Sequence, residues 1–273
     1  MFRREVQRSG LHSALGILGL IFHAAVRNVR KSHGSAVVGL LLNILQSVIM
    51  VLVFYFTFSI LGLRGAALRG DFLLYVMSGV FMFMTHVKAM GAVSAAEGPT
   101  SPMMKHSPMN TAVSIAAAAL GALYLQVLSA GVVLYVYHAA FNPITIHQPV
   151  ETMGMLLLAW ASGVAIGMIL AAARPWAPDA VRIIASIYMR ANMIFSGKMF
   201  LANLMPGYMM PLFDWNPLFH VVDQTRGFVF LNYSPHYTSV SYPIYVTLTL
   251  TMIGLMAEFY TRKHASASWS AGK

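Results

Sequence analysis

The chain of 273 residues contains no cysteine, which excludes disulfides, thiolate metal sites and cysteine nucleophiles. Charge is scarce as well, because Asp, Glu, Lys and Arg make up only 10% of the residues, compared with about 25% in an average soluble domain. Apolar residues reach 58%, and the mean hydropathy is +0.67. A water-soluble globule cannot hide that much apolar surface. The composition therefore excludes a soluble enzyme and makes lipid the main solvent of the chain.

Catalytic signatures are also missing. The sequence has no Gly-x-Ser-x-Gly motif and no His-Glu pair spaced for zinc. Gly197-Lys198 has neither the upstream glycine nor the following Ser or Thr of a P-loop. We therefore expect no catalytic residue, no metal and no cofactor, and predict that the chain is not an enzyme. A membrane transferase acting on isoprenoid phosphates would need clustered Asp residues at the cytoplasmic interface, where only Glu97 and Asp179 fall.

Long uncharged runs predict an all-α polytopic membrane protein that forms one transmembrane domain over residues 1–273. Each hydrocarbon crossing needs about 20 apolar residues. Six runs meet this need, at 34–63, 72–96, 111–140, 152–173, 182–203 and 243–260. The stretch 204–242 is too apolar for a free loop and too often interrupted by proline for a clean span. We expect it to re-enter the membrane surface before the last span.

The distribution of Lys and Arg predicts the orientation. With the N-terminus in the cytoplasm, twelve Lys and Arg residues fall on the cytoplasmic side and three on the outer side, namely Arg64, Arg69 and Arg226. Both termini are therefore expected to be cytoplasmic. The net charge of +10 does not indicate a nucleic-acid partner, because the basic residues are sparse and separate long apolar runs.

Two cytoplasmic segments are candidate contact surfaces. Residues 11–31 have an apolar and a basic face, which predicts an amphipathic helix in the headgroup layer, as a membrane anchor, a partner contact or both. The loop 97–110 contains three prolines and adjacent exposed methionines, which suit a groove on a partner protein, although an ordinary connector is the alternative. The candidate contact residues of this loop are Glu97, Pro102, Met103, Met104, Lys105 and His106.

Three cations fall inside predicted spans, where charge is costly and tends to mark function. Lys88 and Lys198 lie near span ends, from which their side chains can reach the interface. Arg190 lies about eight residues into its span. It is expected either to line an aqueous path or to pair with a buried anion.

The last third of the chain carries a family resemblance. It contains Phe195-Ser196-Gly197, Leu204-Met205-Pro206 and Trp215-Asn216-Pro217-Leu218-Phe219-His220, followed by Asp223, Arg226 and an aromatic run from Phe228 to Tyr237. This pattern resembles the permease subunit of ABC exporters that carry capsular polysaccharide or O-antigen. The layout of the whole chain is similar as well, with an amphipathic N-terminal helix, six spans and a coupling loop after the second span.

The resemblance implies a homodimer in the bacterial inner membrane, joined by two copies of a separate ABC ATPase subunit. It makes 97–110 the ATPase-coupling loop and 204–242 a periplasmic re-entrant region. Its outer gate would contain Trp215, Asn216, Pro217, His220, Asp223 and Arg226. A periplasmic adaptor and an outer-membrane channel are further expected partners. The alternative cargo for the same architecture is a drug, a lipid or another small hydrophobic molecule.

A sugar polymer moves most easily along aromatic and hydroxyl-bearing walls, because ring faces pack on sugar C–H surfaces and weak hydrogen bonds exchange. Tyr55 and Tyr75 are therefore candidates for the translocation path, together with Arg190 and Lys198. For any single tyrosine, a place in the interfacial belt or in the packed interior is the alternative.

Overall fold

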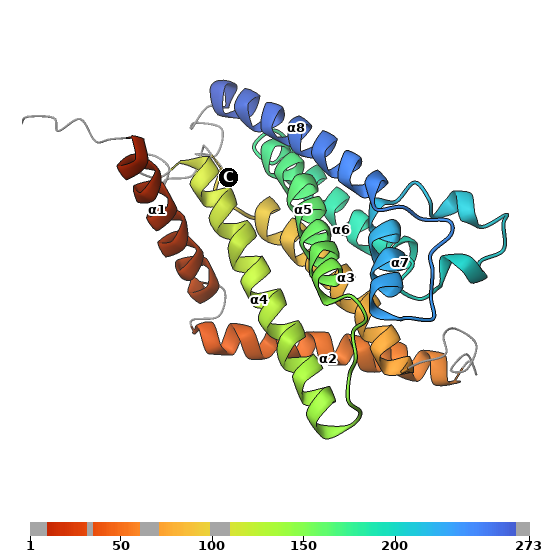
Figure 1. The fold of residues 1–273 in the computed structure, drawn as a ribbon. Coiled ribbons are helices and arrows are strands. Elements are labelled where there is room, and N and C mark those ends of the chain that lie inside the picture. The colour runs from red at the N-terminus through yellow and green to blue at the C-terminus, as the bar shows by residue number, and fades with distance from the viewer. Residues whose placement is uncertain (1–9, 32–34, 61–70, 99–109, 266–273) are drawn as a thin grey trace, which may run out of the picture.

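The computed structural model describes residues 10–31, 35–60, 71–98 and 110–265. All regular structure in these residues is helical, and they contain no strand. The elements are α1 (Gly10–Lys31), α2 (Ala36–Ile60), α3 (Phe72–Ser94), α4 (Thr111–Ala140), α5 (Pro149–Ala173), α6 (Pro178–Phe195), η3 (Ala202–Leu204), η4 (Met210–Leu212), α7 (Pro217–Val229) and α8 (Ser241–His264). Figure 1 shows α3, α4, α5 and α8 as one slanted bundle, with α7 beside one of its ends.

Five helices are long and apolar enough to cross a membrane: α2 from Val37 onward, α3, α4, α5 and α8. Helix α6 has 18 residues, or about 27 Å of rise, and it carries Asp179, Arg182 and Arg190. The prediction of an all-helical, polytopic membrane protein is thereby confirmed, whereas the sixth span and the cytoplasmic termini stay predictions. The predicted range 182–203 runs beyond the end of α6, because Gly197 adopts φ +67° and ends the helix.

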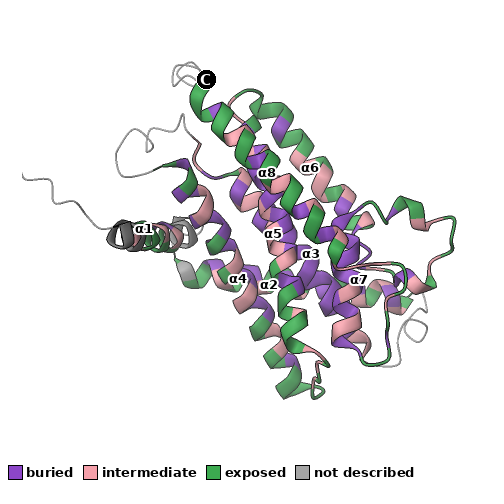
Figure 2. Ribbon diagram, turned by 45° about the horizontal axis from the view of Figure 1, so that its top comes forward, coloured by how far each residue is buried: buried purple, intermediate pink, exposed green. Residues whose placement is uncertain are grey.

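Helix α3 is the centre of the bundle. It packs against α2, α4, α5, α6 and α7, and every residue from Leu74 to His86 is buried. Figure 2 shows this contrast, since α3 and α7 are mostly buried while α8 and α6 are largely exposed. A helix that is apolar on all sides is typical of a helix enclosed by protein. Helix α3 is therefore the element through which the others are connected.

The helices start at side chains that satisfy their free backbone N–H groups. Asp71 Oδ1 accepts hydrogen bonds from the amides of Leu73 at 2.9 Å and Leu74 at 3.4 Å at the start of α3. Asn110 Oδ1 accepts one from the amide of Val113 at 2.8 Å at the start of α4. Helices α5 and α6 instead begin with a proline, whose missing N–H costs nothing there, and α7 has a proline in its first turn as well as a side-chain cap from Asn216.

Two glycines bring α5 against α3. A Cβ atom added to Gly163 would lie 2.2 Å from the carbonyl oxygen of His86, and one added to Gly167 would lie 2.8 Å from that of Met90. Any side chain at these positions would push the two helices apart. The Gly-x-x-x-Gly spacing therefore marks a real helix–helix contact in this chain.

Helix α1 does not extend the bundle. It packs on the beginning of α4, where Ala24 contacts Val113 and Ala117. In Figure 2 it is seen end-on while the bundle helices run across the page, so α1 crosses their direction. A second apolar face of α1 is exposed at Ile17, Leu18, Phe22 and Val26.

Candidate functional site

The two ends of the bundle carry different polar arrangements. We call the end that holds α7 and residues 196–203 the α7 end. We call the opposite end, where α3 stops and α4 begins, the loop end. Helix α7 packs against α3, α5 and α8, and Leu218, Phe219, Val221 and Val222 are completely buried. A helix of 13 residues is thus enclosed by the ends of much longer helices (Figure 1).

Asn216 fixes the start of α7 against α6. Its side-chain oxygen accepts a hydrogen bond from the amide of Leu218 at 3.0 Å, which caps α7. Its side-chain nitrogen donates to the side-chain oxygen of Asn192 at 3.0 Å and to the carbonyl of Phe195 at 2.9 Å. One buried amide therefore holds the start of α7 and the last turn of α6 together.

Arg226 holds the turn that follows α6. Its guanidinium, completely buried, donates to the carbonyl oxygens of Gly197 at 2.9 Å, Lys198 at 2.5 Å and Phe200. These carbonyls lie just past the end of α6, where the helix dipole is negative. The guanidinium also stacks 4.2 Å from the ring centre of Tyr75 on α3. Arg226 thus joins α7, the turn after α6 and α3 at one point.

Asp223 organises the loop that leaves α7. Its carboxylate accepts hydrogen bonds from the amide of Ala202 at 3.2 Å, the hydroxyl of Tyr233 at 2.6 Å and the hydroxyl of Thr238 at 2.8 Å. Burial, reinforced by the Asp223 carboxylate, raises the pKa of Tyr233 above its ordinary value. The phenol therefore stays protonated and keeps donating to Asp223.

His220 closes the same loop in a defined tautomer. Its Nδ1 accepts from the amide of Ser239 at 3.1 Å, so the proton resides on Nε2, which donates to the carbonyl of Asp214 at 2.7 Å. The ring packs 4.6 Å from that of Tyr242, whose hydroxyl donates to the carbonyl of Trp215. The start of α8 is thereby tied to the start of α7.

Lys198 is a buried cation at the α7 end. Its side chain is enclosed by aromatic rings, with Nζ 3.4 Å from the ring centre of Phe83 and 4.9 Å from that of Phe54. Nζ has no hydrogen-bond partner among the described residues. Cation–π attraction partly replaces its lost hydration. The backbone of Lys198 also approaches Gly79 of α3, where an added Cβ would lie 3.0 Å from the Lys198 carbonyl.

The loop end holds a large cavity. It has a volume of about 720 Å³ and lies between α2, α3 and α4, with Met189 of α6 at one side. It extends along α4 from Ser114 to Gln126, which is about 18 Å of helix. Many of its lining residues are Gly or Ala: Gly39, Gly91, Ala92, Ala95, Ala96, Ala118, Gly121 and Ala122. Facing helix surfaces made of Gly and Ala leave the space between them unfilled.

Polar groups border this cavity. Lys88 Nζ donates to Gln46 Oε1 at 2.5 Å. Asn43 Nδ2 donates to Gln126 Oε1 at 2.6 Å and to Ser129 Oγ at 2.8 Å, which fixes α2 to α4. The cavity thus combines one lysine, one carboxylate at Glu97, Ser114 and several amides with a wall that is otherwise apolar.

Arg174 connects α5 to the end of α3. Its guanidinium donates to the carbonyls of Ser94 at 3.0 Å and Ala96 at 2.7 Å, so it satisfies one carbonyl at the end of α3 and one just beyond it. Burial lowers the pKa of Arg174, while nearby Glu97 opposes that shift. The amide of Glu97 in turn donates to Ser114 Oγ of α4 at 3.1 Å. Helices α3, α4 and α5 are therefore linked where the loop 97–110 begins.

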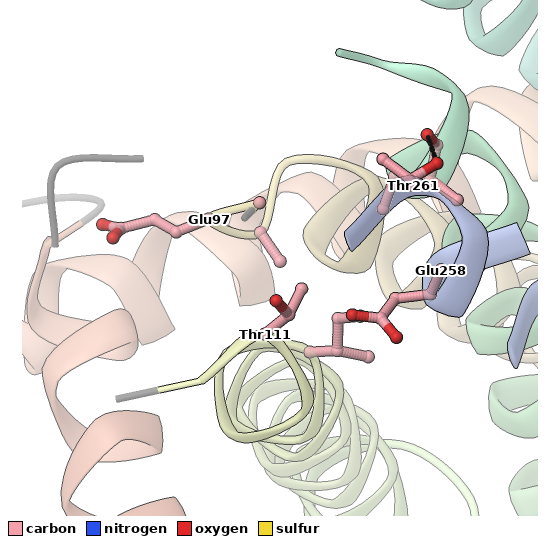
Figure 3. Close-up of a pocket in the computed structure, with 9 residues that line it drawn as sticks. Glu97, Thr111, Glu258 and Thr261 are labelled. Atoms are coloured by element: carbon pink, nitrogen blue, oxygen red, sulfur yellow. Dashed lines mark hydrogen bonds between the residues drawn. The ribbon is translucent and has the colours of Figure 1, made fainter. Parts of the chain in front are cut away.

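A smaller pocket lies beside this link, between the ends of α3, α4, α5 and α8 (Figure 3). The carboxylate of Glu258 points toward Thr111, whereas the side chain of Glu97 points away from the pocket. Thr261 Oγ1 donates to the carbonyl of Ala172 at 2.9 Å, which ties α8 to α5.

The sequence-predicted residues fall into three groups. Of the coupling residues, Glu97 is at the loop end, while Pro102, Met103, Met104, Lys105 and His106 lie outside the described residues. All six predicted gate residues gather around α7, and all but Trp215 are buried.

The predicted path residues do not form one surface in a single chain. Tyr75 is buried and donates to the carbonyl of Met199 at 3.2 Å, and Lys198 is enclosed as described. Tyr55 is half-buried beside Phe72, and Arg190 is exposed on α6.

Sequence reasoning missed a polar bridge inside the bundle. His86 of α3 is completely buried, with Nδ1 2.8 Å from Ser162 Oγ of α5 and Nε2 2.9 Å from the hydroxyl of Tyr188 of α6. A histidine within an apolar run was the available signal. The capping role of Arg174 was missed as well. The cavity lined by Ala and Gly was also missed, although an Ala-rich stretch at the start of α4 follows the loop 97–110 closely in the sequence.

The family model of the ABC-2 type transporter matches residues 20–230, which is most of the chain. No curated protein sequence matches the chain. The matched family consists of permease subunits of ABC exporters, which typically lack an ATPase of their own and associate with an ABC ATPase subunit. The matched residues include the central helix α3, the cavity and the whole of α7. The chain therefore belongs to the ABC-2 type transporter family, as a multi-pass membrane permease.

Proposed function

We propose that the chain exports capsular or lipid-linked polysaccharide across the bacterial inner membrane, as a homodimer powered by two copies of a separate ATPase. With six spans and both termini in the cytoplasm, as the sequence predicts, the loop end would lie inside and the α7 end outside. The excess of Lys and Arg on the loop-end side supports this orientation. The sequence itself carries no P-loop.

The observation that carries the proposal is the position of α3 between the two ends. At the loop end, α3 leads into the segment 97–110 and is bound by Arg174 of α5. At the α7 end, Tyr75 of α3 lies under Arg226 and contacts the turn after α6. A close-packed helix transmits displacement along its axis rather than absorbing it. Movement of the coupling loop would therefore reach α7 through α3.

In this account, the residues around α7 form the outer gate. Asn216, Asp223 and Arg226 hold the closed arrangement through buried hydrogen bonds. Arg190 and Tyr55, which are less enclosed, would face a path completed by the second copy. Helix α1 would lie in the cytoplasmic headgroup layer with its exposed apolar face in lipid.

The coupling step is tested in the loop 97–110. Replacing Pro102 and Lys105 with alanine should leave the permease in the membrane but abolish both polysaccharide export and cargo-stimulated ATP hydrolysis of the assembled complex. A matched control is His264→Ala, an exposed change at the end of α8. Normal export and normal ATPase stimulation in the loop variant would refute the proposed coupling.

The identity of the cargo has one specific competitor. The cavity at the loop end has a largely apolar wall, which favours a drug, a lipid or another small hydrophobic molecule. Deleting the gene separates the two cargo classes. Loss of surface polysaccharide supports the proposal, whereas normal polysaccharide with altered drug sensitivity supports the competitor. A periplasmic adaptor and an outer-membrane channel would complete the route of a polysaccharide.

A further inference from the structure

The cavity at the loop end combines features that rarely occur together. Lys88 is the only Lys or Arg among the described residues that line it. It lies six residues before Ser94, the last residue of α3, which is about 9 Å along the helix. That distance is within the leaflet near the loop end rather than at the centre of the bilayer. The cavity therefore offers a positive charge just below the membrane surface.

The neighbours of Lys88 leave that charge available. Among the described residues its side chain hydrogen-bonds to Gln46 Oε1, a neutral acceptor. The one carboxylate among the described residues that line the cavity is Glu97, beyond the end of α3. An ammonium beside a neutral amide keeps two further N–H donors for a ligand. Lysine commonly binds phosphate in this way, as a compact point charge.

The remaining walls suit the rest of an amphiphile. Asn43 of α2 and Gln126 of α4 bring amide groups to the cavity wall, and the hydrogen bond between them fixes that part of the wall. Leu42, Leu125 and Met189 supply larger apolar contacts. A volume of about 720 Å³ is within the range of sites that bind a small ligand or headgroup.

We propose that this cavity binds the headgroup of an anionic phospholipid-like amphiphile, with its phosphate at Lys88 Nζ and its neighbouring oxygens at the amides. The acyl chains would extend along α2 into the surrounding lipid, since the lipid-side face of α2 is apolar and exposed at Leu41 and Leu45. The inference deepens the proposed function, because such a site would receive the lipid anchor of a glycan or a lipid cargo. Lipid binding is measured without export, so its failure is separate from failure of the proposed export.

The role of the Lys88 charge is tested with the purified full chain reconstituted in nanodiscs that contain equal amounts of phosphatidylglycerol and phosphatidylcholine, from which the protein is released for measurement. Native mass spectrometry should find phosphatidylglycerol retained preferentially on the wild type. Lys88→Gln should weaken that retention about tenfold, because a charge-assisted hydrogen bond is lost. Lys88→Arg should restore most of it, which a merely structural role for the side chain would not predict.

The space is tested by filling it. A Cβ atom on Gly91 would meet no atom within 4 Å, so Gly91→Phe should fold while its ring occupies the cavity. We expect at least a tenfold loss of phosphatidylglycerol retention. Gly131→Phe is the matched control, since Gly131 is an exposed helical glycine of α4 with equally open surroundings, and it should retain the lipid like the wild type.

Three results would overturn the inference. Equal retention of phosphatidylglycerol and phosphatidylcholine by the wild type would show that no anion is recognised. Unchanged retention in both Lys88→Gln and Gly91→Phe would place the lipid elsewhere on the protein. Thermal stabilisation by inorganic phosphate, without any preference for phosphatidylglycerol, would identify a free anion rather than a lipid as the ligand.

Discussion

The α7 end and the loop end use polar residues in opposite ways. At the α7 end, Asp223 and Arg226 are buried and bonded to backbone and hydroxyl groups from several segments. At the loop end, Lys88 and its amide neighbours border an open space between helices rich in Gly and Ala. A polar cluster with many internal hydrogen bonds favours one arrangement, whereas an unfilled cavity admits a ligand. We call the hydrogen-bonded cluster around Asp223 and Arg226 the lock, because it holds the α7 end in one arrangement. The loop end instead leaves space for a ligand.

The lock is broken most severely at Arg226. Arg226→Met would leave the carbonyls of Gly197, Lys198 and Phe200 without their donor, and we expect a loss of about 3 kcal/mol or more in unfolding free energy. Thermal unfolding of the detergent-purified chain measures it. Arg182→Met is the control, because Arg182 forms an exposed ion pair with Asp179 and should change stability by less than about 1 kcal/mol. Equal effects of the two changes would refute the lock.

The contact between α5 and α3 gives the next largest effect. Gly163→Ala places a Cβ atom against the His86 carbonyl and should destabilise the chain by about 1–3 kcal/mol. The same change at Gly154, an exposed position of α5 with nothing within 4 Å, should stabilise it by about 0.5–1 kcal/mol. Opposite signs from two identical substitutions in one helix are the expected result, and equal signs would contradict the packing.

A substitution of Lys198 is expected to affect export more than the free energy of unfolding. Lys198→Met keeps the volume but removes a buried ammonium that has no hydrogen-bond acceptor among the described residues. We expect unfolding free energy to change by less than about 1.5 kcal/mol. Export should nevertheless fall, because Lys198 is a predicted residue of the translocation path. Unaltered export in a normally folded Lys198→Met protein would remove Lys198 from the functional residues.

Tyr233 provides the mildest test of the lock. Tyr233→Phe deletes the hydrogen bond to Asp223 and should cost about 1–2 kcal/mol at neutral pH. Because the folded-state pKa of Tyr233 is raised, its contribution is complete below about pH 10, the ordinary tyrosine value, and is lost as pH rises further. The wild type should therefore lose stability above pH 10 more steeply than Tyr233→Phe. Parallel pH profiles would contradict this.

The sequence predicted features that depend on local composition. Uncharged runs located the membrane helices because each run is itself long enough to cross lipid. Helix α7 begins at Asn216 and Pro217, which is a typical helix start, although the pair was predicted only as part of the family motif and the outer gate. The gate candidates lie together around α7 because Trp215 to Arg226 are close in the chain, and their role as a gate stays a prediction.

Features that depend on distant contacts could not be predicted in this way. Tyr75 meets Arg226 across 151 positions of sequence, and no pattern in either segment indicates the pairing. The aromatic character of Tyr75 suggested a path, whereas its environment made it a buried packing residue. The contacts of Arg174 could not be predicted, because the carbonyls that it binds belong to Ser94 and Ala96, about 80 positions earlier in the chain. The cavity was missed because unfilled space depends on how α2, α3 and α4 are placed together.

The central claim is that α3 carries motion from a separate ATPase to the gate, and that this separate subunit hydrolyses the ATP. The most direct measurement places the purified permease in liposomes, alone or with its ATPase partner, and follows ATP hydrolysis and glycan movement. We predict that neither occurs with the permease alone and that both occur when the partner and ATP are present. Hydrolysis or glycan movement by the permease alone would contradict the account.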